Sequence, residues 1–118
     1  MSHLSILPTV LRDVDVLIQA LEDLDLTVIR GGDLSGFADQ REAVALRVQL
    51  PEGTWLGWRH EPNGELALVG DLQQLGRSRS LQQLIGSITR RYAAHQALRN
   101  VARDLPGATV HVAQGLPL

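Results

Sequence analysis

Cysteine and lysine are both absent from the 118-residue chain. Without cysteine the protein has no disulfide, no thiolate nucleophile and no cysteine-ligated zinc or iron–sulfur site, which suits a reducing cytoplasm. Without lysine, all 11 positive side chains are arginine. Arginine is suited to bidentate contacts with phosphate or carboxylate groups, but a GC-rich genome is the simpler explanation for its exclusive use.

Long apolar runs and aromatic side chains are also scarce. No apolar run approaches the roughly 20 residues that span a bilayer, and the N-terminus lacks the apolar core of a signal peptide. We therefore expect a cytoplasmic protein without a membrane partner. The chain has only four aromatic residues and a formal net charge of -2. Neither a base-stacking platform nor a general attraction to nucleic acid is expected from this composition.

The longest regular segment runs from Ser80 to Pro106 and predicts one amphipathic helix. Ser80 and Gln83 have the spacing of a capping box, and Pro106-Gly107 would end the helix. Its apolar side chains recur at helical spacing and should form one buried stripe, which comprises Leu81, Leu84, Ile85, Ile88, Tyr92, Leu98, Val101, Ala102 and Leu105.

The rest of the chain predicts one further helix and several strands. Asp13 can cap a helix that runs to about Leu24, and Asp25 can take the left-handed exit that glycine usually fills. Residues 33–42 are polar and irregular, and we expect them to be the most mobile loop; residues 76–79 should be a polar lead-in to the long helix. In the segment 43–50, we expect Val44, Leu46, Val48 and Leu50 to point inward together. Strands are expected at residues 1–7, 26–30, 43–50, 54–60, 65–71 and 108–113, with Asn63-Gly64 as a hairpin turn.

These elements follow the order strand, helix, four strands, helix, strand, or the same order with one strand fewer. They predict an α+β fold in which an antiparallel sheet of about five to six strands carries both helices on one face, because that arrangement buries the two apolar stripes in one layer. At this length we expect a single domain at residues 1–113 and a frayed C-terminal tail at residues 114–118.

No catalytic, metal or cofactor site is predicted. The four histidines are His3, His60, His95 and His111, and no two have the spacing of metal ligands. His95 falls near the apolar stripe of the long helix, where a hydrogen-bonded structural histidine is the usual case. The chain has no nucleophile elbow and no glycine-rich phosphate loop. The sequence therefore gives no positive support for an enzyme.

Arginine side chains make the solvent side of the long helix basic, with Arg90, Arg91 and Arg99 on the helix and Arg77 and Arg79 just before it. This pattern fits either an ordinary solvated helix face or a docking surface for an acidic partner or an RNA backbone. Trp55 and Trp58 lie three apart on one strand and should point to opposite faces, one into the core and one outward. The candidate partner-binding residues are Arg90, Arg91, Tyr92, His95, Arg99, Trp58 and Arg59.

Four segments of the chain resemble one known family. They are MSHLS at residues 1–5, DVDVLIQALEDLDLTV at 13–28, LALVGDLQ at 66–73 and ITRRYAAHQAL at 88–98. The family is found in cyanobacteria and algal chloroplasts and is called hypothetical chloroplast reading frame thirty-five, a domain of unknown function. The chain matches the family pattern at Ser2, His3, Asp13, Asp15, Arg91, Tyr92 and Ala93. It departs from the pattern at Leu4, Val14, Asp25 and Arg90, where the family has an aromatic residue, arginine, glycine and glutamine.

The resemblance implies a cytoplasmic protein, or a stromal one in a plastid, and carries no established activity, cofactor or catalytic residue. The family's genes tend to lie near AAA-type ATPases, which suggests an accessory role beside such a machine. We therefore expect a small non-enzymatic adaptor that binds a protein partner, either an ATPase of this kind or a second copy of itself. The alternative is a small-ligand or enzymatic site formed by Ser2, His3, Tyr92 and His95. A third hypothesis is weak RNA binding through the arginine face.

Overall fold

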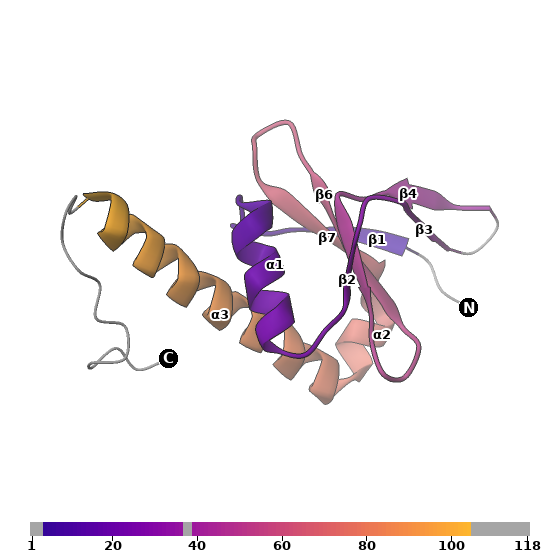
Figure 1. The fold of residues 1–118 in the computed structure, drawn as a ribbon. Coiled ribbons are helices and arrows are strands. Elements are labelled where there is room, and N and C mark those ends of the chain that lie inside the picture. Colours follow the sequence, from indigo (N-terminus) through magenta and orange to yellow (C-terminus); the bar gives the residue numbers. More distant parts are fainter. Residues whose placement is uncertain (1–3, 37–38, 105–118) are drawn as a thin grey trace.

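The structure is a computed structural model that describes residues 4–36 and 39–104. Its centre is a five-stranded antiparallel sheet (Figure 1). The strands lie in the spatial order β1 (Leu4–Pro8), β7 (Leu66–Asp71), β6 (Trp55–His60), β5 (Leu46–Gln49) and β2 (Val28–Arg30). Strands β5, β6 and β7 are consecutive antiparallel neighbours and form a meander. The expected final strand at 108–113 and the tail at 114–118 lie outside the described residues.

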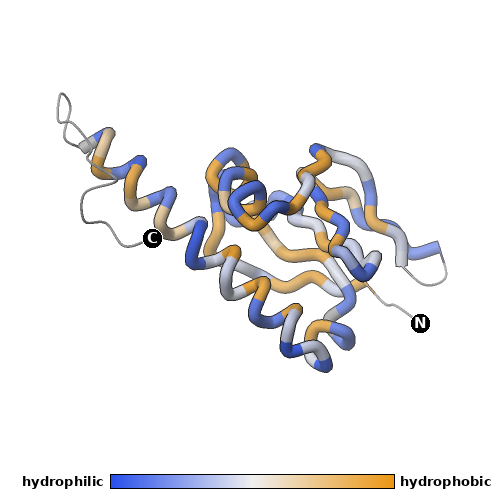
Figure 2. Tube along the Cα trace, turned by 60° about the horizontal axis from the view of Figure 1, so that its bottom comes forward, coloured by the Kyte–Doolittle hydropathy of each residue, from blue (hydrophilic) through white to orange (hydrophobic). Residues whose placement is uncertain are grey.

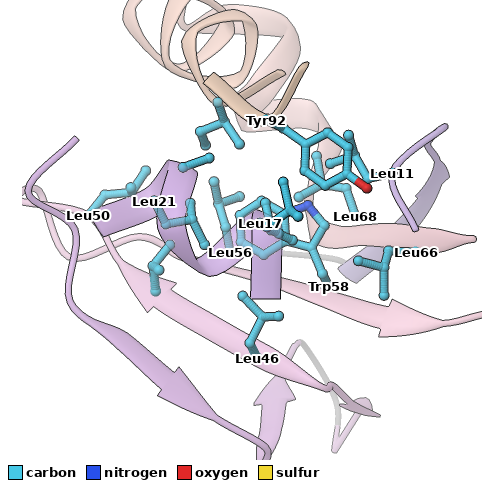
Figure 3. Close-up of a cluster of buried hydrophobic side chains, with 14 of the residues drawn as sticks. Leu11, Leu17, Leu21, Leu46, Leu50, Leu56, Trp58, Leu66, Leu68 and Tyr92 are labelled. Atoms are coloured by element: carbon cyan, nitrogen blue, oxygen red, sulfur yellow. The ribbon is translucent and has the colours of Figure 1, made fainter. Parts of the chain in front are cut away.

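Both long helices pack on one face of this sheet, as the sequence predicts. Helix α1 (Val14–Asp23) and helix α3 (Arg79–Asp104) contribute buried side chains to the same core as β5, β6 and β7. Trp58 is at the centre of that core and is only 2% exposed. Figure 3 shows its indole among Leu17 from α1, Leu66 and Leu68 from β7, and Tyr92 from α3. The α+β class and the one-sided helix layer are therefore confirmed.

The opposite face of the sheet carries a feature that the sequence analysis missed. Strands β3 (Asp33–Ser35) and β4 (Arg41–Ala43) form a separate two-stranded sheet, so the expectation of a mobile loop at 33–42 is wrong for these residues. Leu34 and Val44 pack against Val69 there, in a second cluster with Leu4, Ile6 and Trp55 at its margin. The sequence does not indicate this pairing, because both strands are short and only one of their side chains, that of Leu34, is buried.

The prediction of one continuous strand at 43–50 is wrong, because the strand is broken at Val44. The ladder is interrupted between β4 and β5, where the N–H of Val44 donates to the carbonyl of Gly32 and the N–H of Gly31 donates to the carbonyl of Ala45. The break reverses the alternation, so Leu46 and Val48 face the helices while Val44 faces the other way. Gly57 makes room for it, since a Cβ at Gly57 would lie 2.7 Å from Cγ1 of Val44.

The helix termini follow the predicted chemistry at α1 and depart from it at α3. The carboxylate of Asp13 accepts the N–H of Val16, and Asp25 has φ 61°, so the cap and the left-handed exit are both confirmed. A short helix α2 (Leu72–Arg77), capped by Asp71, replaces the expected lead-in. Helix α3 is capped by Ser78, whose Oγ accepts the N–H of Leu81. The capping box at Ser80 is therefore wrong, because the helix begins one residue earlier, at Arg79.

Helix α3 is much longer than the sheet it covers. Its 26 residues extend over about 39 Å at 1.5 Å per residue, and its C-terminal half extends beyond the edge of the sheet (Figures 1 and 2). Apolar residues recur along this projecting half in Figure 2, and Val101 is 43% exposed there. Among the described residues no helix combines the length and apolar character that a membrane span requires.

Candidate docking surface on helix α3

The candidate residues on α3 separate into a group that holds α1 and a group that faces solvent. Tyr92 belongs to the first group and is buried. Its hydroxyl oxygen accepts the backbone N–H groups of Arg12 at 3.0 Å and Asp13 at 2.9 Å, directly before the first turn of α1. These two donors come from a chain segment about 80 positions earlier in the sequence. Tyr92 therefore fixes where α1 begins, and its hydroxyl oxygen accepts two hydrogen bonds inside the protein.

His95 and Arg91 bind the opposite end of α1. The Nε2 of His95 lies 2.6 Å from Oδ2 of Asp23, and Nη1 of Arg91 lies 4.0 Å from the same oxygen. A carboxylate at the C-terminal end of a helix is unfavourable to the helix dipole, and the two donors from α3 compensate for it. No local signal could have shown the compensation, because His95 follows Asp23 by 72 residues.

Arg99 completes the crossing of the two helices. Its Nη1 lies 2.9 Å from Oδ2 of Asp13, while Oδ1 of the same carboxylate caps α1. The pair is partly exposed, so its contribution to stability is small, at about 0.2–1 kcal/mol. Arg91, Tyr92, His95 and Arg99 thus share one structural task. They hold α1 across α3, and the basic surface available to a partner is correspondingly reduced.

Arg90 is the candidate that faces solvent. It is exposed, and its Nη2 donates to the hydroxyl of Ser87 on the same helix at 3.1 Å. A shallow groove of about 320 Å³ lies beside it, where the end of α1 meets α3. Arg90 and Arg91 supply the cationic rim of this groove, Leu24 its apolar side and Ser87 and Ala94 its small side chains.

Charge is strongly segregated between α3 and the rest of the protein. Five arginines and one acidic residue, Asp104, give α3 a formal charge of +4. The remaining residues contain six arginines and twelve acidic side chains and have a formal charge of -6. From Arg79 to Arg103 the helix has no acidic residue at all. The net charge of -2 for the whole chain is therefore the sum of a basic helix α3 and an acidic remainder of the chain.

The candidates on β6 need correction. Trp58 is buried in the core, and Trp55 is the tryptophan on the opposite, half-buried side. Arg59 forms ion pairs with Glu42 at 2.9 Å and Glu61 at 3.2 Å, which tie β6 to β4 and to the following turn. The i to i+3 spacing predicts opposite faces for the two tryptophans, but only the helix layer decides which face is the core.

Trp55 belongs to an open pocket of about 480 Å³ on the face away from the helices. The guanidinium carbon of Arg47 lies 5.1 Å from the centre of its ring, and a Cβ at Gly32 would lie 3.0 Å from that carbon. The guanidinium is thus held between an aromatic ring and a glycine, a cation–π arrangement that fixes the loop before β3. Asp71 and Thr54, which also line this pocket, are already bonded to residues of α2.

The alternative site of Ser2, His3, Tyr92 and His95 gains no support. Ser2 and His3 lie outside the described residues. The polar atoms of Tyr92 and His95 point to opposite ends of α1, one to Asp13 and the other to Asp23, so these two side chains do not converge on a common ligand. Within residues 4–36 and 39–104, no cluster of three or more His, Cys, Asp or Glu side chains could hold a metal ion.

The fold and the surface together define a small α+β domain with a projecting basic helix. The chain belongs to the family described as "Protein of unknown function (DUF1257)", whose sequence model matches residues 20–114. It is also 31% identical over 101 residues to the uncharacterized protein ycf35 of Guillardia theta, an alignment that covers 84% of this chain and 77% of that protein. The family suggested by the four sequence segments is therefore confirmed. No solved structure matches the chain.

Proposed function

We propose that this protein is a non-enzymatic accessory module that binds a protein partner through the solvent side of α3. The observation that carries the proposal is the segregation of charge, because α3 has no acidic side chain between Arg79 and Arg103. Basic surfaces of this kind increase the association rate and the selectivity for acidic partners.

The projecting half of α3 supplies the apolar contact that such a partner needs. Val101 is exposed and Leu98 half-buried, and Ala94 and Ala97 between Arg90 and these residues allow a second helix to approach closely. Figure 2 shows this half of the helix extending away from the sheet. An amphipathic helix with acidic flanks, from an AAA-type ATPase or another protein, fits both the charge and the apolar row.

Arg90→Glu is the sharpest test of this surface. Arg91 is a poorer choice because it lies against Asp23, and a reversed charge there would disturb the crossing of α1 and α3. Arg41→Glu is the matched control, since Arg41 is equally a solvent-exposed arginine but lies on β4, on the far face of the sheet. Circular dichroism should show both variants folded.

The tagged full-length chain and both variants are then used for affinity purification from the native host, with mass spectrometry. We expect a protein that is recovered with the wild type and with Arg41→Glu and lost with Arg90→Glu. Binding of the purified pair should weaken as salt concentration rises. The same partner list for all three chains would refute the proposal. Recovery that depends on intact RNA would do so as well, in favour of the RNA hypothesis.

A further inference from the structure

A second surface of the protein is apolar instead of basic. It is a groove of about 240 Å³ between the end of β1 and helix α3. Trp58 and Leu68 form its floor, Ile85 and Thr89 its helical wall, and Leu7 and Val10 its rim. None of its ten lining side chains is charged. Thr89 here and Ser87 beside Arg90 are two positions apart on a helix, so the two grooves lie on opposite sides of α3.

The rim of this groove consists of apolar side chains that are exposed to solvent. Val10 is 78% exposed and Leu7 is 38% exposed, which makes them two of the four large apolar side chains exposed in the described part of the chain. The surface therefore has a protruding valine directly beside an apolar hollow. Contiguous apolar patches on a protein surface are typical of interaction sites.

Backbone pairing along the neighbouring sheet edge does not account for this patch. At one end of β1, the side-chain amide of Gln40 bonds to the backbone of Leu4. The amide oxygen accepts the N–H of Leu4 at 2.9 Å, and the amide nitrogen donates to the carbonyl of Leu4 at 2.8 Å. Pro8 at the other end of β1 has no N–H to offer. An added strand would find few free partners on β1, so contacts at this surface must come from side chains.

We infer that the occupant of this groove is the same groove of a second copy of the chain. The protruding Val10 and the hollow lie on one patch, so a two-fold arrangement can place each Val10 in the other copy's groove. The absence of charge allows two identical patches to meet without repulsion. Two copies that met through the solvent side of α3 would instead bring like charges together, since Arg90 is exposed there.

This dimer leaves the solvent side of both α3 helices accessible. It goes beyond the proposed function and does not depend on it. If both hold, the dimer presents two basic helices at once, and a partner with two acidic segments would bind with increased avidity.

The test compares full-length wild type, Val10→Asp and Val101→Asp by sedimentation velocity over a range of protein concentrations. Both substitutions place one aspartate at an exposed valine, but Val101 lies on the projecting half of α3 and serves as the control. We expect the wild type and Val101→Asp to pass from monomer to dimer with the same midpoint. Val10→Asp should raise the dimer dissociation constant by at least about tenfold, because a charge would enter an apolar contact.

Cross-linking provides a second measurement, and the absence of cysteine keeps it free of background. An oxidised mixture of Val10→Cys and Thr89→Cys chains should form disulfides between the two kinds of chain, since each residue 10 approaches the partner's residue 89. A wild type that stays monomeric at every concentration, or a dimer unaffected by Val10→Asp, would overturn the inference. A monomeric Val10→Cys variant whose thiol resists alkylation would overturn it too, in favour of coverage by the chain's own residues after Asp104.

The two proposals fail independently of each other. Loss of the partner with Arg90→Glu while the chain still dimerises supports the basic surface alone. Loss of the dimer with Val10→Asp while the partner is still recovered supports the apolar surface alone.

Discussion

Replacing Tyr92 by phenylalanine removes one oxygen atom and keeps the ring that packs in the core. That oxygen accepts two backbone donors, the N–H groups of Arg12 and Asp13, at 3.0 and 2.9 Å. Both donors stand where the chain turns into α1, and their positions are only partly accessible to water. The phenylalanine variant leaves both N–H groups without an acceptor in the protein.

The expected cost follows from these two lost bonds. A buried donor that loses its acceptor costs about 1–3 kcal/mol, and partial access to water brings the total for both donors to roughly the same range. For a domain of this size, each kcal/mol lowers the midpoint of thermal unfolding by about 4 °C. Tyr92→Phe should therefore lower the midpoint by about 4–12 °C without changing the fold.

Thermal and urea denaturation measure the change, and amide hydrogen exchange locates it. We expect faster exchange at Arg12 and Asp13 and little change in β6 and β7. Ser87→Ala is the control, because it also deletes a hydroxyl from α3, but one that bonds only the exposed side chain of Arg90. Its effect should stay within about 0.5 kcal/mol. A Tyr92→Phe variant as stable as Ser87→Ala, with unchanged exchange at Arg12 and Asp13, would refute the assigned role of the hydroxyl.

Three further substitutions test the packing. Trp58→Ala should lower the free energy of unfolding by about 3–5 kcal/mol in urea titrations, because Trp58 is buried. Trp55→Ala, at a half-buried position, should lower it by less than about 2 kcal/mol. Similar losses for the two variants would contradict the placement of Trp58 in the core. Gly57→Ala should lower the free energy of unfolding by about 1–3 kcal/mol, because its Cβ would meet Val44 at 2.7 Å. Gly76→Ala in α2 has open space around its Cβ and should raise the free energy of unfolding by about 0.5–1 kcal/mol. The same urea titrations would show whether the two changes have opposite signs. Asp25→Gly should raise the unfolding free energy by up to about 1 kcal/mol by relieving a residue at φ 61°, and a loss measured by calorimetry would show that the aspartate side chain is needed there.

Local chemistry in the sequence was sufficient for most of the elements. Asp13 caps α1 because its carboxylate reaches the N–H of Val16, three residues away, and Asp25 leaves the helix with positive φ. The Asn63-Gly64 turn between β6 and β7 and the alternation within β5 also depend on residues a few positions apart. Each of these features depends on residues that are neighbours in the chain, which is why a pattern could predict them.

The errors arose where a distant segment decides the outcome. The pairing of β3 with β4 and the reversal at Val44 depend on the space that Gly57 leaves on another strand. Strand alternation separates two faces without saying which of them the helices cover, so only the structure shows that Trp58, a candidate contact residue, lies in the core. The roles of Tyr92, His95 and Arg99 depend on α1, which precedes them by some 70 to 86 residues.

The sequence by itself determined that helix α3 is long and basic, with no acidic residue before Asp104. Charge and helical spacing can be read directly from the order of the residues. The tertiary structure decided which of its basic and polar side chains remain available. By laying α1 across α3 it engages Arg91, His95 and Arg99 with the carboxylates of Asp13 and Asp23 and leaves Arg90 facing solvent. An ion pair requires two groups within about 4 Å, and only the folded chain brings these groups so close.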